Sequence, residues 1–280
     1  MPEGCEVRVV ADAVAKGIGN IFETAEIIEN VPGVLHRYSR ELPKNWNVIV
    51  NQRWQLKKVR TRGKLILLDI EIYETKEPWV LLSTLGMSGD WRFNASGEKH
   101  TRFAFLKANG DDLSYYDPRC FGTIRVAKPK DAKTCENKIG WDLLQSPMDK
   151  TKWIQLQSSN KIENEEIKVA LMRQDVTSGP GNIYSCEILH EVGVHPKQLV
   201  SKIDPTKWFD INIIAHSILQ KAYKLGGSSI KDFTADGHTG NAQTMLKIYG
   251  KKLCPNGHKI ETIQQDGRTT WFCPVEQKLS

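Results

Sequence analysis

The apolar positions of the chain change from a helical spacing to a strand spacing and back. A helix over residues 3–17, with one face on a core, is predicted by an i, i+3, i+4, i+7, i+8 pattern of apolar residues: Val7, Val10, Ala11, Val14 and Ala15. Short segments rich in strand-forming residues follow, separated by Gly, Pro, Asn and Asp, at 65–73, 79–85, 102–107 and 113–116. They predict a β-sandwich or flattened barrel with the N-terminal helix against it.

From about residue 149 the pattern becomes mostly helical. Helical segments separated by Gly and Pro are predicted at 162–174, 183–194 and 210–225. The chain then ends in a Lys-rich stretch with two β-like segments around QQDG at 264–267. We therefore expect an α+β multidomain protein: a helix plus β-sandwich over 1–148, a helical domain over 149–245 and a β-hairpin over 246–280.

Composition narrows the class only modestly. With 280 residues, 40% hydrophobic and 26% charged, the chain has the composition of a globular protein, which excludes wholesale disorder. The net charge of +6 mildly favours an anionic partner. No apolar run approaches the about 18 residues of a membrane span, and the opening MPEGCEVR has no apolar core typical of a secretory signal. We expect an intracellular monomer that does not bind membranes.

The first residues carry candidate chemistry. Methionine before a small residue is normally removed, and this would expose Pro2 as an N-terminal secondary amine. An α-amino group titrates near about 7.7–8.0, so part of it is an unprotonated nucleophile at neutral pH. Its adduct with a sugar aldehyde carbon is a cationic imine, an electron sink. Glu3 and Glu6 lie near one face of the first turn, where one can be a general acid. Alternatively, Pro2 only begins the helix and the carboxylates offset the helix dipole.

The C-terminal region has the spacing of a metal site. Cys254 and His258 are separated by three residues, and Cys273 lies fifteen residues after His258. A β-hairpin can fold such ligands into a tetrahedral zinc site. A chain of this length does not need disulfides, so its six cysteines are better interpreted as free thiols or metal ligands.

Several motifs together resemble one family. The opening MPEGCE resembles the PELPE or PEGPE start of the formamidopyrimidine-DNA glycosylase (Fpg) and endonuclease VIII family of DNA glycosylase/AP lyases. Further segments resemble that family's motifs in the same order: TRGK (61–64), LGMSG (85–89), DPRCFG (117–122), SGPGNIYSCEIL (178–189) with VHP (194–196), GGSSIKDFTADG (226–237), and CPNGH (254–258) with GRTTWFCP (267–274). The resemblance spans nearly the whole chain. It implies a helix-two-turn-helix domain over 149–245 and a zinc-finger-like hairpin over 246–280.

The resemblance implies roles for four catalytic residues. Pro2 would be the nucleophile at C1′ of the deoxyribose, and Glu3 the acid that helps to open the sugar. Lys64 would be an essential cation that holds a phosphate beside the sugar, and Arg268 a fingertip arginine that contacts phosphate and positions the catalytic centre. Taken alone, Lys64 would be interpreted as a solvated surface lysine.

Further residues are implied to bind DNA. Met87, Arg119 and Phe121 correspond to the side chains that fill the gap left by an everted nucleotide. In GPGNIY, the glycines are expected to turn backbone N–H groups outward, and Asn182 to donate to a phosphate. Without the family's other motifs, Met87 and Phe121 would be interpreted as core residues and Arg119 as a salt-bridge partner.

The chain departs from the family pattern at the finger. Glu276 stands where the family supplies a fourth cysteine, so the implied zinc ligands are Cys254, His258, Cys273 and Glu276. Carboxylate is a less favoured structural zinc ligand than thiolate, and the alternative is a metal-free hairpin held by packing of Trp271 and Phe272. Cys5 and Cys120 also replace family residues, without an expected effect on catalysis.

The function implied is that of a bifunctional glycosylase/AP lyase of base excision repair, acting through a Pro2 Schiff base and β,δ-elimination. The finger is most similar to that of the second vertebrate type of endonuclease VIII-like protein, which favours oxidised pyrimidines. The expected partner is damaged DNA in double-stranded, bubble or single-stranded form. The alternatives are an Fpg-like oxidised-purine glycosylase, a catalytically silent damaged-DNA-binding protein, and a zinc-ribbon protein of transcription or translation. Base preference is expected to depend on the pocket and on the loop between Phe233 and Tyr249.

Overall fold

The computed structural model describes residues 2–28, 44–50, 52–228 and 239–279. Contacts group the chain into two compact units. The first comprises Met1–Pro2, Glu6–Lys138 and Gly226–Asn241, and the second comprises Glu3–Cys5, Ile139–Leu225 and Ala242–Ser280. The predicted finger, residues 246–280, thus belongs to the same unit as the helices, and the predicted domain boundaries stay a prediction. Residues 229–238, which include most of the GGSSIKDFTADG motif and the start of the predicted base-reading loop, lie outside the described residues.

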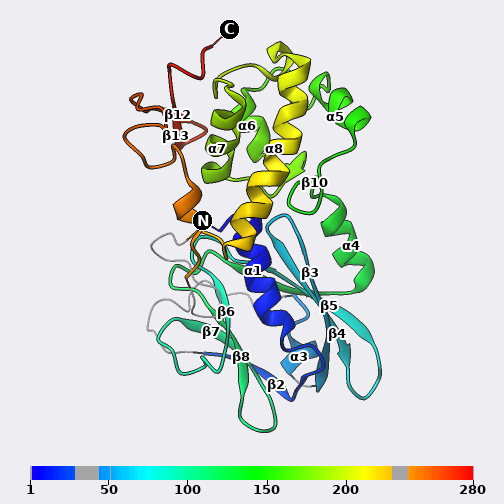
Figure 1. Ribbon diagram of the computed structural model, residues 1–280. Coiled ribbons are helices and arrows are strands. Elements are labelled where there is room, and N and C mark those ends of the chain that lie inside the picture. The colour runs from blue at the N-terminus through cyan, green and yellow to red at the C-terminus, as the bar shows by residue number, and fades with distance from the viewer. Residues whose placement is uncertain (1, 29–43, 51, 229–238, 280) are drawn as a thin grey trace. The chain divides into compact units, whose positions relative to one another are not determined.

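The first unit is a sandwich of two antiparallel sheets (Figure 1). One sheet has the strand order β1 (Ile21–Phe22), β3 (Trp54–Arg62), β4 (Leu65–Ile72), β5 (Pro78–Thr84), β9 (Thr123–Ala127). The other has the order β2 (Thr24–Ile27), β7 (Thr101–Leu106), β8 (Asp112–Tyr116), β6 (Asp90–Phe93). Among the residues that the structure describes, three helices accompany them: α1 (Gly4–Ala15), α3 (Asn47–Val50) and α4 (Pro129–Asn137).

An aromatic core lies between the two sheets. Trp54 stacks on Phe22 with ring centroids 4.4 Å apart and meets Phe105 edge-on at 5.1 Å. The apolar stripe of α1, including Val7 and Val14, is buried in the same cluster. The apolar side chains of the strands and of α1 are therefore buried in one core, and the predicted sandwich with an N-terminal helix is confirmed.

The second unit is mostly helical. Its principal helices are α5 (Lys150–Gln157), α6 (Ile167–Met172), α7 (Asn182–Val192) and α8 (Pro205–Lys224), of which α7 and α8 pack together (Figure 1). Short elements complete it: the parallel pair β10 (Trp141–Asp142) and β11 (Thr177–Ser178), the 3-10 turns η1 (Val200–Lys202) and η2 (Ala242–Met245), and the hairpin β12 (Glu261–Gln265) and β13 (Arg268–Phe272). Trp153 of α5 stacks on Trp208 of α8 at 4.5 Å, and each indole N–H donates to the other residue's carbonyl.

Helix ends differ from the predicted ones for local reasons. Helix α8 begins five residues before the predicted segment, because the Asp204 carboxylate caps it by accepting from the N–H groups of Thr206 and Lys207. Helix α7 ends at Val192, since Gly193 adopts a left-handed conformation with φ 68°. Within the described ranges, none of the helices has the length and apolar character needed to cross a membrane.

Candidate active site

The carboxylate of Glu3 is held at the amino end of α7, within the second unit. It is buried and accepts hydrogen bonds from the backbone N–H groups of Gly181 at 2.6 Å, Ile183 at 2.7 Å and Tyr184 at 3.3 Å. The first N–H groups of a helix have no partner inside the helix, and the helix dipole favours an anion beside them. This end of α7 therefore binds Glu3 as a carboxylate.

The glycines of the SGPGN turn make room for the N-terminal segment. A Cβ atom on Gly181 would lie 2.5 Å from the Glu3 carboxyl carbon, and one on Gly4 would lie 2.6 Å from Cα of Gly179. The Gly4 N–H also donates to the Gly179 carbonyl at 2.8 Å. The N–H groups expected to point outward toward DNA instead point at Glu3, because a buried carboxylate needs donors. That part of the prediction is wrong.

Lys168 is a residue that the sequence interpretation missed. It lies on α6, is fully buried, and its Nζ donates to Oδ1 of Asn182 at 2.7 Å. Burial lowers the pKa of its ammonium group below the ordinary value, opposed in part by the nearby Cys186 and Glu3. A lysine inside the apolar run IKVALM was the one available signal, since a buried lysine needs a partner.

Asn182 connects α7 with the finger hairpin. Its Nδ2 donates to the carbonyl of Thr269 at 3.0 Å, next to Arg268, the first residue of β13. Arg268 also acts electrostatically on Lys168. The predicted residues Glu3, Asn182 and Arg268 thus gather around the amino end of α7, together with Lys168.

Pro2 and Lys64 belong to the first unit. Pro2 stands two residues before α1 begins. Lys64 and Gly63 form the two-residue turn between β3 and β4, where Arg62 pairs with Leu65. Gly63 has φ 54°, a backbone conformation that glycine adopts readily. Lys64 is therefore carried at the end of a paired hairpin.

The three predicted gap-filling side chains stand on two loops that are tied together. Met87 and Phe121 are 38% and 49% exposed, and Arg119 is exposed as well. The buried Asp117 carboxylate accepts from the Ser88 hydroxyl at 2.9 Å and from the Gly122 N–H at 2.8 Å. It thereby joins the 85–89 loop to the 117–122 loop, so exposed Met87, Arg119 and Phe121 share one fixed support.

The predicted metal ligands lie together in the second unit. One ligand atom from each of Cys254, His258, Cys273 and Glu276 lies within 4.8 Å of the others. Oε1 of Glu276 is 3.2 Å from Sγ of Cys254 and 3.0 Å from Nδ1 of His258. Two thiols, an imidazole and a carboxylate are a donor set that zinc accepts, so the residues fit the metal.

The surroundings shift the pKa values of two of these four residues, Glu276 and Cys254. Hydrogen bonds from Asn256 and Cys254 lower the pKa of Glu276 to about 2, against the effect of desolvation. Desolvation and the neighbouring Glu276 raise the pKa of Cys254. The thiol of Cys254 donates to the Glu276 carboxylate, and a cation bound between them would favour loss of that proton.

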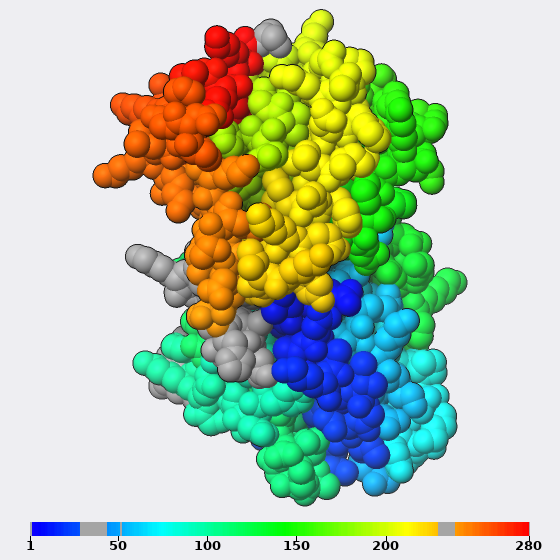
Figure 2. All heavy atoms as spheres, viewed as in Figure 1, coloured from blue at the N-terminus to red at the C-terminus, as the bar shows by residue number. Residues whose placement is uncertain are grey.

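The finger hairpin is attached to the helices of its unit by buried amides. The Gln277 side chain donates to the carbonyl of Val194 and accepts from the N–H of Cys273, both at 2.8 Å. Gln265 donates to Glu166 and to the carbonyl of Pro196. Figure 2 shows the orange and red atoms of the finger packed on the yellow-green atoms of the helices.

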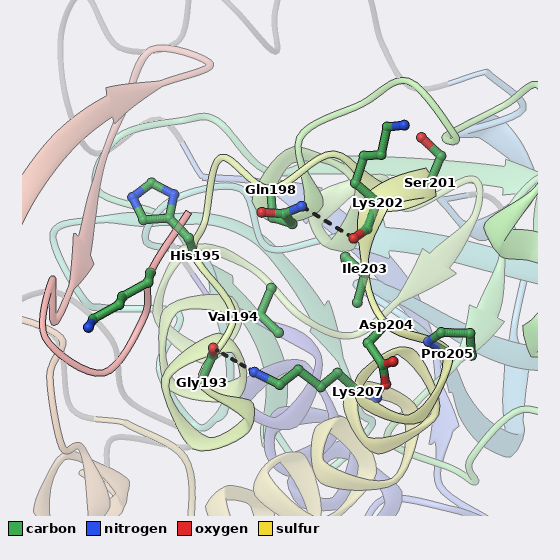
Figure 3. A pocket seen from close by; sticks show the side chains of 11 residues that line it. Gly193, Val194, His195, Gln198, Ser201, Lys202, Ile203, Asp204, Pro205 and Lys207 are labelled. Atoms are coloured by element: carbon green, nitrogen blue, oxygen red, sulfur yellow. Dashed lines mark hydrogen bonds between the residues drawn. The ribbon is translucent and has the colours of Figure 1, made fainter. Parts of the chain in front are cut away.

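The second unit also holds a cavity of about 530 Å³ (Figure 3). It is lined by residues 193–195, 198, 201–205 and 207 and by Lys278. Lys207 donates to the Gly193 carbonyl there, and Gln198 to that of Lys202. The residues lining this cavity include none of the predicted catalytic, DNA-binding or metal-binding ones, so we assign it no part in the chemistry.

Family models match both halves of the chain. Residues 1–124 match the formamidopyrimidine-DNA glycosylase N-terminal domain, and residues 139–234 match the formamidopyrimidine-DNA glycosylase H2TH domain. The formamidopyrimidine-DNA glycosylase of Shewanella denitrificans is 32% identical over 291 residues, which cover 99% of each chain. That of Zymomonas mobilis is 34% identical, over 71% of this chain and 74% of its own.

Solved structures of the Lactococcus lactis Fpg are similar over the whole chain. The complex of a mutant with Fapy-dG-containing DNA has a TM-score of 0.81 at 29% identity, covering 99% of this chain and 100% of that one. The complex with DNA containing an abasic site has a TM-score of 0.80 with the same identity and coverage. The similarity thus extends to sequence and fold alike.

Proposed function

The chain belongs to the formamidopyrimidine-DNA glycosylase family, and we propose that it excises oxidised bases from DNA with the N-terminal amine of Pro2 as nucleophile. It is a DNA glycosylase of DNA repair with AP lyase activity. The observation that carries the proposed mechanism is the position of Glu3: the residue after Pro2 in sequence is a buried carboxylate fixed by three backbone N–H groups.

In the proposed first step, the nitrogen of Pro2 attacks C1′, and the damaged base leaves with the electron pair of its bond to C1′ and takes a proton from water. Glu3, held as a carboxylate, accepts the proton that the prolyl nitrogen loses. It then returns this proton to O4′ as the sugar ring opens, which leaves a cationic imine between C1′ and Pro2. The predicted acid role of Glu3 is thus the second half of a proton transfer that begins with a base.

The imine withdraws electrons from the sugar and permits elimination. Loss of a C2′ proton expels the 3′ phosphate, and a second elimination expels the 5′ phosphate. Lys64 and Arg268 are proposed to hold these phosphates, and Asn182 to donate to a further one through its amide. The hydrogen bond from Lys168 to Oδ1 of Asn182 fixes the NH₂ group as the donor end, and a phosphate would have to share this group with the Thr269 carbonyl.

We propose that the exposed side chains of Met87, Arg119 and Phe121 fill the gap that is left in the duplex when the damaged nucleotide is flipped out of the helix. Their support is the network around Asp117, which keeps the backbone of both loops in place while the side chains remain exposed. Large apolar side chains exposed on rigid loops suit insertion between bases. We propose that a monomer binds the damaged DNA.

We further propose that Cys254, His258, Cys273 and Glu276 hold a structural zinc ion. When bound, the metal would fasten the loops on which the hairpin of Arg268 stands, and it takes no part in the reaction at the sugar. The support is the convergence of four ligand atoms of suitable type. Packing of Phe272 and Trp271 alone, the metal-free alternative, leaves two buried thiols beside a carboxylate without a purpose.

For the substrate we propose oxidised pyrimidines, including those in single-stranded or bubble DNA, from the resemblance of the finger. The second candidate is an oxidised-purine preference. It is favoured by the names of the relatives and by the Fapy-dG complex of the Lactococcus enzyme. An oxidised pyrimidine complex of that same enzyme also exists, so its fold accommodates both classes of base.

A panel of oligonucleotides tests this function. Each carries one oxidised pyrimidine, one oxidised purine or one abasic site, in single-stranded, bubble or duplex form, and excision and borohydride trapping are measured. We expect excision with trapping, fastest for pyrimidines, in protein whose Met1 has been removed. A matched protein with an uncleaved N-terminal tag should do neither. Binding of damaged DNA without excision would instead identify the catalytically silent alternative.

A further inference from the structure

The carboxylate of Glu276 faces two different sets of partners. Its Oε1 is directed at Cys254 and His258 and accepts a hydrogen bond from Nδ2 of Asn256 at 2.9 Å. Its Oε2 lies 3.5 Å from Nδ1 of His190. One oxygen therefore belongs to the ligand cluster, and the other faces a residue outside it.

His190 is a buried residue that the fold alone does not explain. It stands in the last turn of α7 and is 8% exposed. Its Nδ1 is buried without a hydrogen-bond partner among the described residues, apart from the longer contact with Glu276. A buried ring nitrogen without a partner costs free energy of folding. Its direction toward a carboxylate oxygen therefore suggests a functional role for His190.

We propose that His190 is a positioning residue of the metal centre: Nδ1–H donates to Oε2 of Glu276 and thereby presents Oε1 to the metal. This inference rests on the zinc site proposed above. A carboxylate is a weaker structural ligand than the thiolate that the family has at this position, and it can rotate away from the metal. Hydrogen bonds to the second oxygen of a ligating carboxylate restrict that rotation.

The charges of the site support the same role. Two thiolates and one carboxylate exceed the charge of a divalent cation by one, and His190 supplies a donor on the side away from the metal. His190 also sits at the carboxyl end of α7, where the helix offers no N–H groups to an anion. A side-chain donor is the only kind that this helix end can provide.

Zinc affinity of the full chain, measured by competition with a chromophoric chelator, tests the inference. His190→Leu should weaken zinc binding by about 10-fold or more, in the range found for lost partners of metal ligands. His190→Asn, whose Nδ2 replaces the donor near the position of Nδ1, should lose only about 3-fold, a smaller part of that effect.

The decisive comparison introduces His190→Leu into a Glu276→Cys variant, which lacks the oxygen that His190 contacts. In that background His190→Leu should change zinc affinity by less than about 2-fold, because a pair loses its coupling when one partner is gone. An equal loss in both backgrounds would mean that His190 acts only through packing, and no loss in either would also overturn the inference. A wild-type protein that binds no zinc would overturn the zinc site as well, which distinguishes the two failures.

Discussion

The two ends of α7 each face a carboxylate, and they hold it in opposite ways. At the amino end, Glu3 is bound by three backbone N–H groups and needs no side chain. At the carboxyl end, Glu276 is partnered by side chains, namely Asn256, His258 and Cys254, with His190 behind it. The helix dipole attracts an anion at the first end and repels it at the second.

The backbone alone supplies the hydrogen-bond donors for the carboxylate at the amino end of α7. At the carboxyl end, side chains and the proposed metal must hold the carboxylate. Any sequence that forms α7 with glycine at 181 presents the donors for Glu3. Glu276 depends on a particular set of side chains, those of Asn256, Cys254 and His258, and on the proposed zinc ion. We therefore expect the amino end to tolerate loss of the metal and the carboxyl end to lose order.

Replacing the acid at the amino end should have the largest effect. Glu3→Gln turns an amide NH₂ toward N–H donors and removes the proton acceptor, so excision of a damaged base should fall by about 10²- to 10⁴-fold. Schiff-base formation on a pre-formed abasic site should persist in part, because there the base is already gone. Single-turnover excision and borohydride trapping measure the two steps separately.

Glu187→Gln is the matched control for that variant. Glu187 is equally buried and also accepts from three backbone N–H groups, those of Lys247, Ile248 and Tyr249. Both variants should lose about 1–3 kcal/mol of stability in denaturant unfolding, but Glu187→Gln should keep the chemical step at saturating enzyme. Equal loss of excision in both variants would remove the special role of Glu3.

A methyl group at the turn should displace Glu3 without changing it. Gly181→Ala places a Cβ 2.5 Å from the Glu3 carboxyl carbon, so the carboxylate must move, and we expect about a 10²-fold loss of excision. Gly97→Ala is the control, since a Cβ there meets nothing within 4 Å. Normal excision by Gly181→Ala would show that the position of Glu3 is not critical.

Metal removal should act on the other end of α7. We expect about one zinc per chain by elemental analysis, lost in Cys254→Ser. At a zinc concentration 100-fold above the dissociation constant, bound metal should add about 2.7 kcal/mol to the free energy of unfolding. Zinc-free protein with unchanged stability and full lyase activity would favour the packed, metal-free hairpin.

The smallest expected effect concerns one phosphate contact. Arg268→Ala should reduce the slope of log K against log salt by about 0.9 on duplex DNA, the value for one phosphate. Lys252→Ala, an exposed finger lysine to which we assign no phosphate, should leave the slope unchanged. An unchanged slope for Arg268→Ala would remove this residue from the interface.

The sequence predicted those features that depend on local pattern. The stripe of α1, the strands of the sandwich and the ligand spacing of Cys254 and His258 all follow from neighbours in the chain. Helix ends were less predictable, since Asp204 extends α8 backward through a cap that apolar spacing does not reveal.

Features that depend on distant pairs were not predictable. The donors of Glu3 lie about 180 residues away, so composition and spacing could only propose that the same N–H groups face DNA. Lys168 stood inside an apolar segment, and its partner Asn182 became evident only from the packing of α6 against α7. The role of His190 likewise could be inferred only from its position beside Glu276 in the structure.

The identity of the cross-linked nitrogen tests the central claim most directly. Two other lysines are chemically conceivable nucleophiles: Lys168, whose pKa burial lowers, and Lys64 in the hairpin turn. The enzyme is reduced with borohydride on abasic DNA, digested, and the modified peptide is sequenced by mass spectrometry. We predict that the sugar remnant is attached to the α-nitrogen of Pro2, in protein that lacks Met1. A remnant on Lys168 or Lys64, or equal trapping by protein with a blocked N-terminus, would contradict the account.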